Sequence, residues 1–258
     1  MFHRIGEADR DGSAVVLFSG GQDSTTCLVQ ALRTWRPENV HAVAFNYGQR
    51  HKTELMCATD IAYRLGIGHH LHVLNVEALS ELGGAALTNP DIPVSTDATG
   101  TGNIYAEQHG LPSTFVPGRN MVFLSLATAL AAEVGARHVV TGVCEADRAG
   151  YPDCRPEFVS AAELALRQAL GTEDLLLIAP LLYLTKAATF ALAADLDALD
   201  LIVNETSTCY NGVNIASHDD EQEQLYPWGW GCGECGACAE RAAGWSKYCA
   251  MMESEEER

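Results

Sequence analysis

The amino-acid sequence predicts an α/β protein built on a parallel sheet, with helices on both faces and a metal-binding appendage. Short apolar runs alternate with stretches of helical periodicity between residues 14 and 196, which is the pattern of consecutive βαβ units. The chain after residue 205 is instead dense in cysteine and glycine. We therefore expect an α/β domain at residues 1–205 and a C-terminal segment at residues 206–258 that packs on the same domain.

Five short apolar runs are the expected strands of this sheet, and a helical pattern lies between successive runs. In such a sheet, ligands bind beyond the carboxyl ends of the strands. Residues 75–115, rich in Gly, Pro, Thr and Asp, show no clear periodicity, which is typical of an active-site loop or a lid. The expected strands are residues 14–18, 40–46, 70–74, 137–142 and 175–179, and the expected helices are residues 25–32, 52–65, 120–134, 156–170 and 185–196.

The composition is that of a globular protein, because 47% of the 258 residues are hydrophobic and 19% are charged. This length allows one full core and an appendage. The net charge of -18 argues against a surface that holds nucleic-acid phosphates. The sequence has neither the long apolar run of a membrane span nor the apolar stretch of a signal peptide. We expect a cytoplasmic protein that binds neither nucleic acid directly nor a membrane.

A glycine-containing turn, SGGQDS at residues 19–24, joins the first expected strand to the first expected helix. A helix N-terminus offers unpaired backbone N–H groups and a positive dipole end, and both suit phosphate. Gly20 and Gly21 let the backbone approach an anion closely. Ser19 and Ser24 add hydroxyl groups to the same turn. The motif lacks the lysine of a Walker A loop, and a plain glycine turn before a helix is the alternative interpretation.

Four cysteines in the C-terminal segment are the strongest indication of a metal. Cys232, Cys235 and Cys238 make two overlapping CxxC units, a spacing that lets neighbouring thiolates face one cation. Cys209 can close a tetrahedron across the intervening loop. Four thiolates with no open position predict a structural Zn²⁺ site. An iron–sulfur cluster and thiols without a metal stay open as alternatives, although the spacing of a bacterial ferredoxin is not met.

Two further segments place a cation at the beginning of an expected helix. Gly118, Arg119 and Asn120 put a guanidinium there, which suits a phosphate or a carboxylate. A capping asparagine beside a surface arginine is the alternative. Lys186 stands in the first turn of the helix that follows Thr185, where a cation is unfavourable for the helix dipole. Its position therefore indicates an anion nearby.

The residues that follow the fourth expected strand fall where the ligand crevice of the sheet should lie. Glu145, Asp153 and Arg155 offer paired donors and acceptors, which match the edge of a purine-like ring. An isolated Asp-Cys-Arg is more often a turn. The sequence is therefore compatible both with a contact to a base-like substrate at this position and with a plain turn.

In combination, these segments resemble the 7-cyano-7-deazaguanine synthase family, the nitrile-forming enzymes of the queuosine pathway, within the PP-loop ATP pyrophosphatase superfamily. The similarity extends over about residues 14–248, and its specificity comes from the combination, because the loop at residues 18–24 also fits thiolases, amidases and synthetases. The spacer at residues 213–231 is longer and more acidic than in many members. The matching segments are FSGGQDS at 18–24, YGQRH at 47–51, VPGRN at 116–120, GYPDCRPEF at 150–158, Pro180 with LTK at 184–186, and CYNG at 209–212 with the cysteine-rich run.

The resemblance implies an adenine nucleotide alpha hydrolase-like fold and a ligase that converts 7-carboxy-7-deazaguanine and ammonia to 7-cyano-7-deazaguanine (preQ0). A carboxylate is a poor electrophile, so ATP must first turn one of its oxygens into a leaving group. Ammonia then gives an amide, and activation of the second oxygen gives the nitrile. The resemblance also implies Mg²⁺ with the ATP, one structural Zn²⁺ and a homodimer.

The motifs and the resemblance together predict the roles of individual residues. Asp23, Arg119 and Lys186 are the expected catalytic residues, and the two cations would stabilise phosphate or acyl oxygens. The expected metal ligands are Cys209, Cys232, Cys235 and Cys238. The expected ATP-binding residues are Phe18, Ser19, Gly20, Gly21, Gln22, Asp23, Ser24 and Gly118, and the expected substrate-binding residues are Tyr47, Gln49, His51, Asn120, Glu145, Asp153 and Arg155.

Two other functions compete with this hypothesis. A PP-loop tRNA thiolase requires a catalytic cysteine pair near the loop and a basic RNA-binding surface, and the net charge of -18 counts against it. A zinc-stabilised nucleotide sensor is the non-enzymatic alternative, and it predicts ATP binding without turnover.

Overall fold

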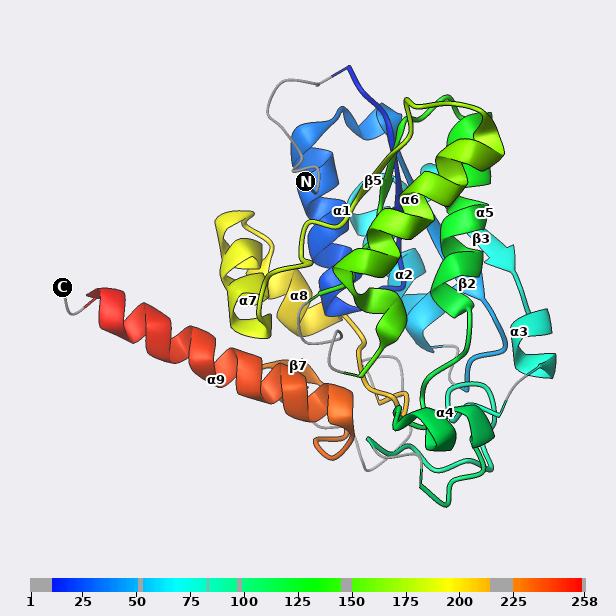
Figure 1. The fold of residues 1–258 in the computed structure, drawn as a ribbon. Helices are drawn as coiled ribbons and strands as arrows, with labels where there is room; N and C mark the ends of the chain where they lie inside the picture. The colour runs from blue at the N-terminus through cyan, green and yellow to red at the C-terminus, as the bar shows by residue number, and fades with distance from the viewer. Residues whose placement is uncertain are drawn as a thin grey trace.

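The computed structural model describes residues 11–50, 53–82, 84–96, 99–144, 150–213 and 225–256. A five-stranded sheet in the order β3-β2-β1-β4-β5 forms its centre, and all neighbouring strands run parallel (Figure 1). This arrangement confirms the predicted α/β fold class with its five-stranded parallel sheet. The strands are β1 (Ala14–Leu17), β2 (Val40–Asn46), β3 (Leu71–Asn75), β4 (His138–Val140) and β5 (Leu176–Ile178).

Helices connect the strands, and most of them lie where the periodicity predicts. The first helix begins three residues earlier than expected, at Gln22, because the end of the SGGQDS turn already has helical geometry. The irregular region at residues 75–115 contains two short helices, α3 and α4. The helices are α1 (Gln22–Thr34), α2 (Thr53–Arg64), α3 (Ala78–Glu81), α4 (Ile104–His109), α5 (Arg119–Glu133), α6 (Pro156–Leu170), α7 (Lys186–Asp195), α8 (Leu199–Glu205) and α9 (Gly236–Glu256), with short 3-10 helices at Pro37–Asn39, Gly68–His70 and Pro152–Cys154.

Apolar side chains cover both faces of the sheet. In β1, Val15 belongs to one buried cluster, whereas Ala14 and Val16 belong to the other. Side chains of α5 and α6 complete the cluster around Val15, and those of α1 and α2 complete the opposite one. Successive residues of a strand point to opposite faces, so a sheet covered on both sides needs strands that are apolar at every position. This requirement explains why the strands appear in the sequence as continuous apolar runs.

The C-terminal segment consists of a small hairpin and the long helix α9. The hairpin pairs β6 (Leu225–Tyr226) with β7 (Gly229–Trp230) in antiparallel fashion. Helix α9 packs on α7, where the rings of Phe190 and Trp245 meet edge to face with centroids 5.2 Å apart. The boundary predicted at residue 205 coincides with the end of α8, and the division into two units stays a prediction. No helix in the described ranges combines the length and the apolar character needed to cross a membrane.

Histidines gather on β2 and β3, at the edge of the sheet. Nδ1 of His41 lies 3.1 Å from Nε2 of His72, and the His41 ring stacks on His70 with centroids 4.4 Å apart. Burial, followed by repulsion from His70, His72 and His69, lowers the pKa of His41 to about 4 from 6.5. A ring nitrogen that must accept a hydrogen bond or face another cation resists protonation, so the cluster is stable in its neutral form.

We expect the protein to lose stability as the pH falls from 6.5 towards 4, and His41→Gln to weaken this loss. Because the pKa of His41 is lower in the folded state than in the unfolded state, the unfolded chain binds more protons in this window, and stability rises with pH. Urea unfolding at pH 7 and pH 5 measures the difference. His109→Gln, at an exposed position of α4, is the control. An equal acid sensitivity in both variants would contradict the assignment to His41.

Candidate active site

The site lies at the carboxyl ends of the central strands. Strand β1 has β2 on one side and β4 on the other, so the chain reverses its direction of winding between β1 and β4. Ligand crevices of open parallel sheets form at such a point. A cavity of about 260 Å³ opens there, between Phe18 at the end of β1, Tyr47 at the end of β2 and Thr141 at the end of β4.

The turn at residues 19–24 is held by its own hydroxyl groups. The Ser24 hydroxyl donates to the Gly21 carbonyl at 3.2 Å and accepts a hydrogen bond from the Ser19 backbone N–H at 3.2 Å. Gly21 is the N-cap of α1, and no side chain caps this helix end. The first N–H groups of α1 are therefore oriented beside the cavity without a side-chain acceptor, as an anion-binding turn requires.

Two glycines allow the close packing around this turn. Gly20 has a φ of +78°, and a Cβ there would lie 2.6 Å from the backbone nitrogen of Ala58 in α2. Gly142, after β4, lies so close to α1 that a Cβ would approach the Ser24 nitrogen to 3.1 Å. Only glycine adopts the left-handed conformation of residue 20 without strain, and only glycine fits the space. The turn is thus fixed between α2 and the segment after β4.

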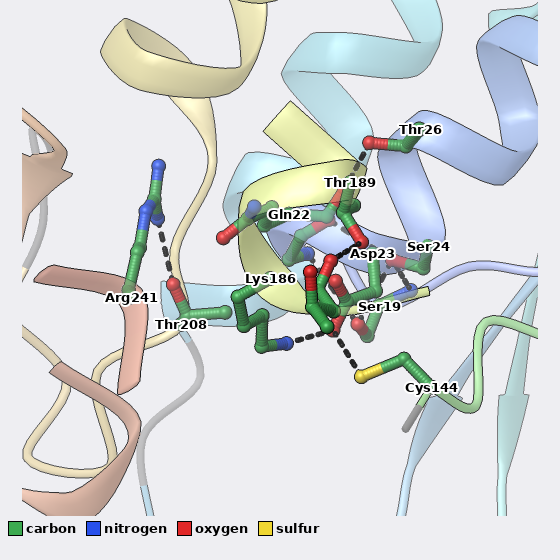
Figure 2. A network of polar contacts seen from close by, with 12 residues as sticks. Ser19, Gln22, Asp23, Ser24, Thr26, Cys144, Lys186, Thr189, Thr208 and Arg241 are labelled. Carbon is green, nitrogen blue, oxygen red and sulfur yellow. Dashed lines mark hydrogen bonds and ion pairs between the residues drawn. The ribbon is translucent and has the colours of Figure 1, made fainter. Parts of the chain in front are cut away.

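Asp23 and Lys186 form an ion pair next to the turn (Figure 2). Asp23 lies in the first turn of α1, and Lys186 is the first residue of α7, which Thr185 caps by accepting a hydrogen bond from the Ala188 N–H at 3.2 Å. The Cys144 thiol lies 3.9 Å from the same Asp23 oxygen. The anion that the position of Lys186 indicates is therefore, in this structure, the Asp23 carboxylate.

Most of the predicted nucleotide-binding and substrate-binding residues meet in the wall of the larger cavity. They come from the turn after β1, the segment after β2 and the beginning of α5, which are separate in sequence. Phe123, Tyr151 and Leu87 complete the apolar part of this wall. The predicted residues in the wall are Phe18, Ser19, Gly21, Asp23, Ser24, Tyr47, Gln49, Arg119 and Asn120.

Arg119 and Tyr47 face each other across this wall. The guanidinium carbon of Arg119 lies 5.8 Å from the centroid of the Tyr47 ring, within the range of a cation–π contact. Burial, together with the nearby Glu54, raises the pKa of Tyr47 to about 12, while Arg119 opposes this rise. Tyr47 is therefore a neutral phenol at physiological pH and can donate a hydrogen bond into the cavity.

Two predicted substrate-binding amides in the wall are engaged by the backbone. Gln49 Nε2 donates to the Phe45 carbonyl at 3.1 Å, and its Oε1 accepts from the Tyr47 N–H at 2.9 Å. Asn120 Nδ2 donates to the Asp153 carbonyl at 3.3 Å. Both side chains thus hold segments of the wall in place, and their contact with a substrate stays a prediction.

Other predicted site residues lie outside this wall. Gly20 supports the turn from behind, and Gly118 is the N-cap of α5 in a left-handed conformation with a φ of +77°. Burial raises the pKa of Asp153, which does not line the cavity, and Arg155 is exposed at the beginning of α6. Gln22 and Lys186 line a second cavity. The remaining predicted substrate contacts, His51 and Glu145, lie outside the described residues.

The second cavity, of about 140 Å³, adjoins the first on the side of the C-terminal segment. Glu54, Thr208 and Tyr210 line both cavities, and Arg241 of α9 lines the second. Burial raises the pKa of Glu54 to about 7, although Arg119 opposes this rise. Sequence reasoning missed these residues. Thr208 and Tyr210 flank Cys209, whereas the sequence around Glu54 and Arg241 contains no motif that singles them out.

The four cysteines converge as predicted. Their Sγ atoms all lie within 4.8 Å of one another, and Sγ of Cys232 is 3.9 Å from that of Cys238. Two thiolates bound tetrahedrally at Zn–S distances of about 2.3 Å are about 3.8 Å apart, so this donor set fits the metal. The backbone N–H groups of Glu234 and Cys235 donate to Cys232 Sγ at 3.4 Å each. Hydrogen bonds from Cys235 and Cys238 lower the pKa of the Cys209 thiol, which favours its thiolate form.

The segment before Cys209 connects this cluster to the turn at residues 19–24. The Ser207 N–H donates to the Gly20 carbonyl at 3.1 Å. The Arg241 guanidinium is buried, and it donates to the Thr208 hydroxyl at 2.6 Å and to the Ile202 carbonyl at 2.7 Å (Figure 2). Burial lowers the pKa of Arg241 to about 10, which still leaves it charged at neutral pH. The C-terminal segment is thus part of the site.

Three solved structures are similar to this chain at low sequence identity. A predicted subunit of a tRNA methyltransferase from Methanocaldococcus jannaschii aligns at 17% identity with a TM-score of 0.44, over 71% of this chain and 74% of that one. The NH3-dependent NAD synthetase of Campylobacter jejuni aligns at 17% identity and a TM-score of 0.41, over 74% and 66%. The NMN synthetase of Francisella tularensis aligns at 15% identity and a TM-score of 0.41, over 74% and 63%.

The family comparison covers nearly the whole chain. Residues 13–249 match the family described as queuosine biosynthesis protein QueC. The matched range includes the turn at residues 19–24, the wall of the larger cavity and the four cysteines. The chain therefore belongs to the QueC family of queuosine biosynthesis, whose members are ATP-dependent 7-cyano-7-deazaguanine synthases that make preQ0.

Proposed function

We propose that the two adjoining cavities are the active site in which this chain converts 7-carboxy-7-deazaguanine to the nitrile. The phosphates of ATP bind at the turn of residues 19–24, and the deazaguanine binds in the larger cavity, against the wall that Tyr47 and Arg119 form. One observation carries this proposal: the uncapped N-terminus of α1 and the guanidinium of Arg119 line the same cavity. A phosphate and a carboxylate can therefore be held next to each other.

The protein groups supply positioning and charge for both activation steps. Each step transfers a phosphate-containing group to an oxygen of the substrate and releases negative charge. The N–H groups of α1 and the side chain of Lys186 stabilise that charge, and Arg119 orients the acyl oxygen. Asp23 keeps the ammonium group of Lys186 beside the turn through their ion pair. Mg²⁺ bound with ATP supplies further charge neutralisation.

The remaining features of the proposal concern the metal and the assembly. The four cysteines bind one structural Zn²⁺, since a closed set of four thiolates leaves no position for a substrate. Metal analysis of the purified protein separates Zn²⁺ from an iron–sulfur cluster. We also propose a cytoplasmic homodimer, as the family resemblance implies, and sedimentation analysis measures its mass.

We expect the purified protein to form a nitrile product when it is incubated with 7-carboxy-7-deazaguanine, ATP, Mg²⁺ and ammonium. Mass spectrometry detects the loss of two water equivalents when the ammonium salt of the acid becomes the nitrile. Asp23→Ala should abolish this product, because it removes the carboxylate that holds Lys186.

Two results would count against the proposal in different ways. Folded, metal-replete protein that binds ATP but forms no product would support the nucleotide sensor instead. If Asp23→Ala still forms the product, the protein catalyses the proposed reaction, but the turn at residues 19–24 is not its site.

A further inference from the structure

Three residues that line the smaller cavity carry buried hydrogen-bond donors without a partner in the described part of the chain. They are Gln22, Ser207 and Arg241, with exposed fractions of 0%, 1% and 1%. The unpartnered atoms are both polar atoms of the Gln22 amide, the hydroxyl oxygen of Ser207 and Nε of Arg241. Buried polar groups in native proteins are almost always paired, so donors of this kind beside a cavity indicate a ligand that offers acceptor oxygens.

Ser207 is the most firmly placed of these three residues. Its backbone N–H donates to the carbonyl of Gly20, in the turn before α1, at 3.1 Å. The Arg241 guanidinium donates to the Thr208 hydroxyl at 2.6 Å and to the Thr206 carbonyl at 3.5 Å, so one side chain holds both neighbours of Ser207 (Figure 2). The hydroxyl is therefore positioned before any ligand binds, and such preorganised donors stabilise a negative charge most effectively.

The Ser207 hydroxyl contributes no hydrogen bond to the fold within the described ranges. A hydroxyl removed from water without a partner costs free energy. The neighbouring Thr206 shows the contrasting case, because its buried hydroxyl donates to the Ile202 carbonyl at 2.6 Å. A polar side chain that costs stability in the free protein is explained if a ligand completes its hydrogen bond.

The other groups around the smaller cavity favour phosphate oxygens as that ligand. The uncapped N-terminus of α1 and the side chain of Lys186 also line it. Ionised phosphate oxygens accept hydrogen bonds and match these donors. Asp23, Glu54 and Glu240 place carboxylates in the same wall, so the phosphates must enter together with Mg²⁺. Mg²⁺ is usually held by one or two carboxylates and substrate phosphates, which suits the buried, unpartnered Oδ1 of Asp23.

We propose that Ser207 is a phosphate-binding residue whose hydroxyl donates a hydrogen bond to a terminal phosphate of ATP in the smaller cavity. The turn at residues 19–24 and the segment before the predicted metal ligand Cys209 then bind the same phosphates. The inference rests on the proposed function, which places the phosphates at that turn. It adds a residue that lies outside every motif of the sequence.

The test measures ligand affinity and stability of the metal-replete full chain. We expect Ser207→Ala to weaken the binding of ATP and of pyrophosphate, each with Mg²⁺, by about 10-fold or more in calorimetry, because a hydrogen bond to a charged group contributes that much. The affinity for adenosine, which has no phosphate, should not change. The urea midpoint of the ligand-free protein should stay equal or rise, because alanine removes a buried polar group that has no partner.

Thr206→Val is the matched control at the neighbouring position. Thr206 is not among the described residues that line the smaller cavity, and its hydroxyl already has a partner in the Ile202 carbonyl. This variant should lower the urea midpoint and leave the affinity for ATP unchanged. The two substitutions therefore have opposite expected patterns, although each removes one buried hydroxyl from the same segment.

The outcomes separate this inference from the proposed function. If Ser207→Ala binds ATP and pyrophosphate as tightly as the wild type, the inference is wrong. If the variant loses affinity for ATP and adenosine alike and its urea midpoint falls, Ser207 has a structural role, which also overturns the inference. None of these measurements uses the nitrile reaction, so a wild type that binds ATP but forms no nitrile contradicts the proposed function alone.

Discussion

Lys186→Met is expected to lower the rate of nitrile formation by about 10³-fold or more. The substitution keeps an unbranched side chain that is one atom shorter, but it removes the cation that pairs with Asp23. It leaves a carboxylate, largely removed from solvent, without its counter-charge, and it removes a donor for the phosphate charge that develops in each activation step. Single-turnover assays with saturating ATP and acid measure the chemical step directly.

Lys247→Met provides the control for this prediction, because Lys247 is exposed on α9 and distant in sequence from the pair. Asp23→Asn combined with Lys186→Met completes a double-mutant cycle. If the two residues act as one unit, the double variant is no slower than the slower single variant. If the losses of rate in the two single variants add up in the double variant, Asp23 and Lys186 act independently. If Lys186→Met has nearly normal activity, Lys186 does not take part in catalysis.

Cys238→Ser is expected to abolish metal binding and to unfold the C-terminal segment. Zn²⁺ binding contributes about 10–16 kcal/mol in zinc-finger peptides, which is comparable with the whole stability of a domain, about 5–15 kcal/mol. Because Cys238 lies in the first turn of α9, loss of the metal should release this helix and with it Arg241 from Thr208. ATP binding should weaken as well, since Thr208 lines both cavities.

Metal content by mass spectrometry, helix content by circular dichroism and ATP affinity by calorimetry test this prediction together. Cys249→Ser is the control, because Cys249 lies on the same helix but outside the cluster of four thiols. Retention of one metal ion per chain in Cys238→Ser would show that three thiolates suffice. Loss of the metal with unchanged ATP affinity would show that the cluster does not support ATP binding.

The periodicity of the chain was sufficient to predict the sheet, because its strands are covered on both faces and appear as unbroken apolar runs. The cysteine spacing likewise predicted the cluster, since a CxxC unit places two thiols close together whatever surrounds them. In both cases the structural cause is local in sequence. The end of the α/β domain at residue 205 depends on how distant segments pack, which no local pattern reports. This boundary stays a prediction.

The site could be predicted only where its residues stand in motifs. Lys186 indicated a nearby anion through its unfavourable place at a helix N-terminus, but its partner Asp23 is 163 positions away, and only the fold brings them together. No local motif marks Glu54 as a site residue, because its environment depends on the packing of α2 behind the turn at residues 19–24. Arg241 resembles any helical surface arginine in the sequence. Its burial depends on the end of α8, where it binds the Ile202 carbonyl.

The order in which the site is assembled during protein synthesis follows from the contact between the two ends of the described chain. The turn at residues 19–24 and α1 are synthesised before α8 and α9. Thr208 and Arg241, which complete the smaller cavity, emerge far later. A nascent chain therefore carries an incomplete smaller cavity until residue 241 has been added. It acquires the complete smaller cavity only when α9 has formed, so a chain cut short before residue 241 should bind ATP more weakly than the full chain.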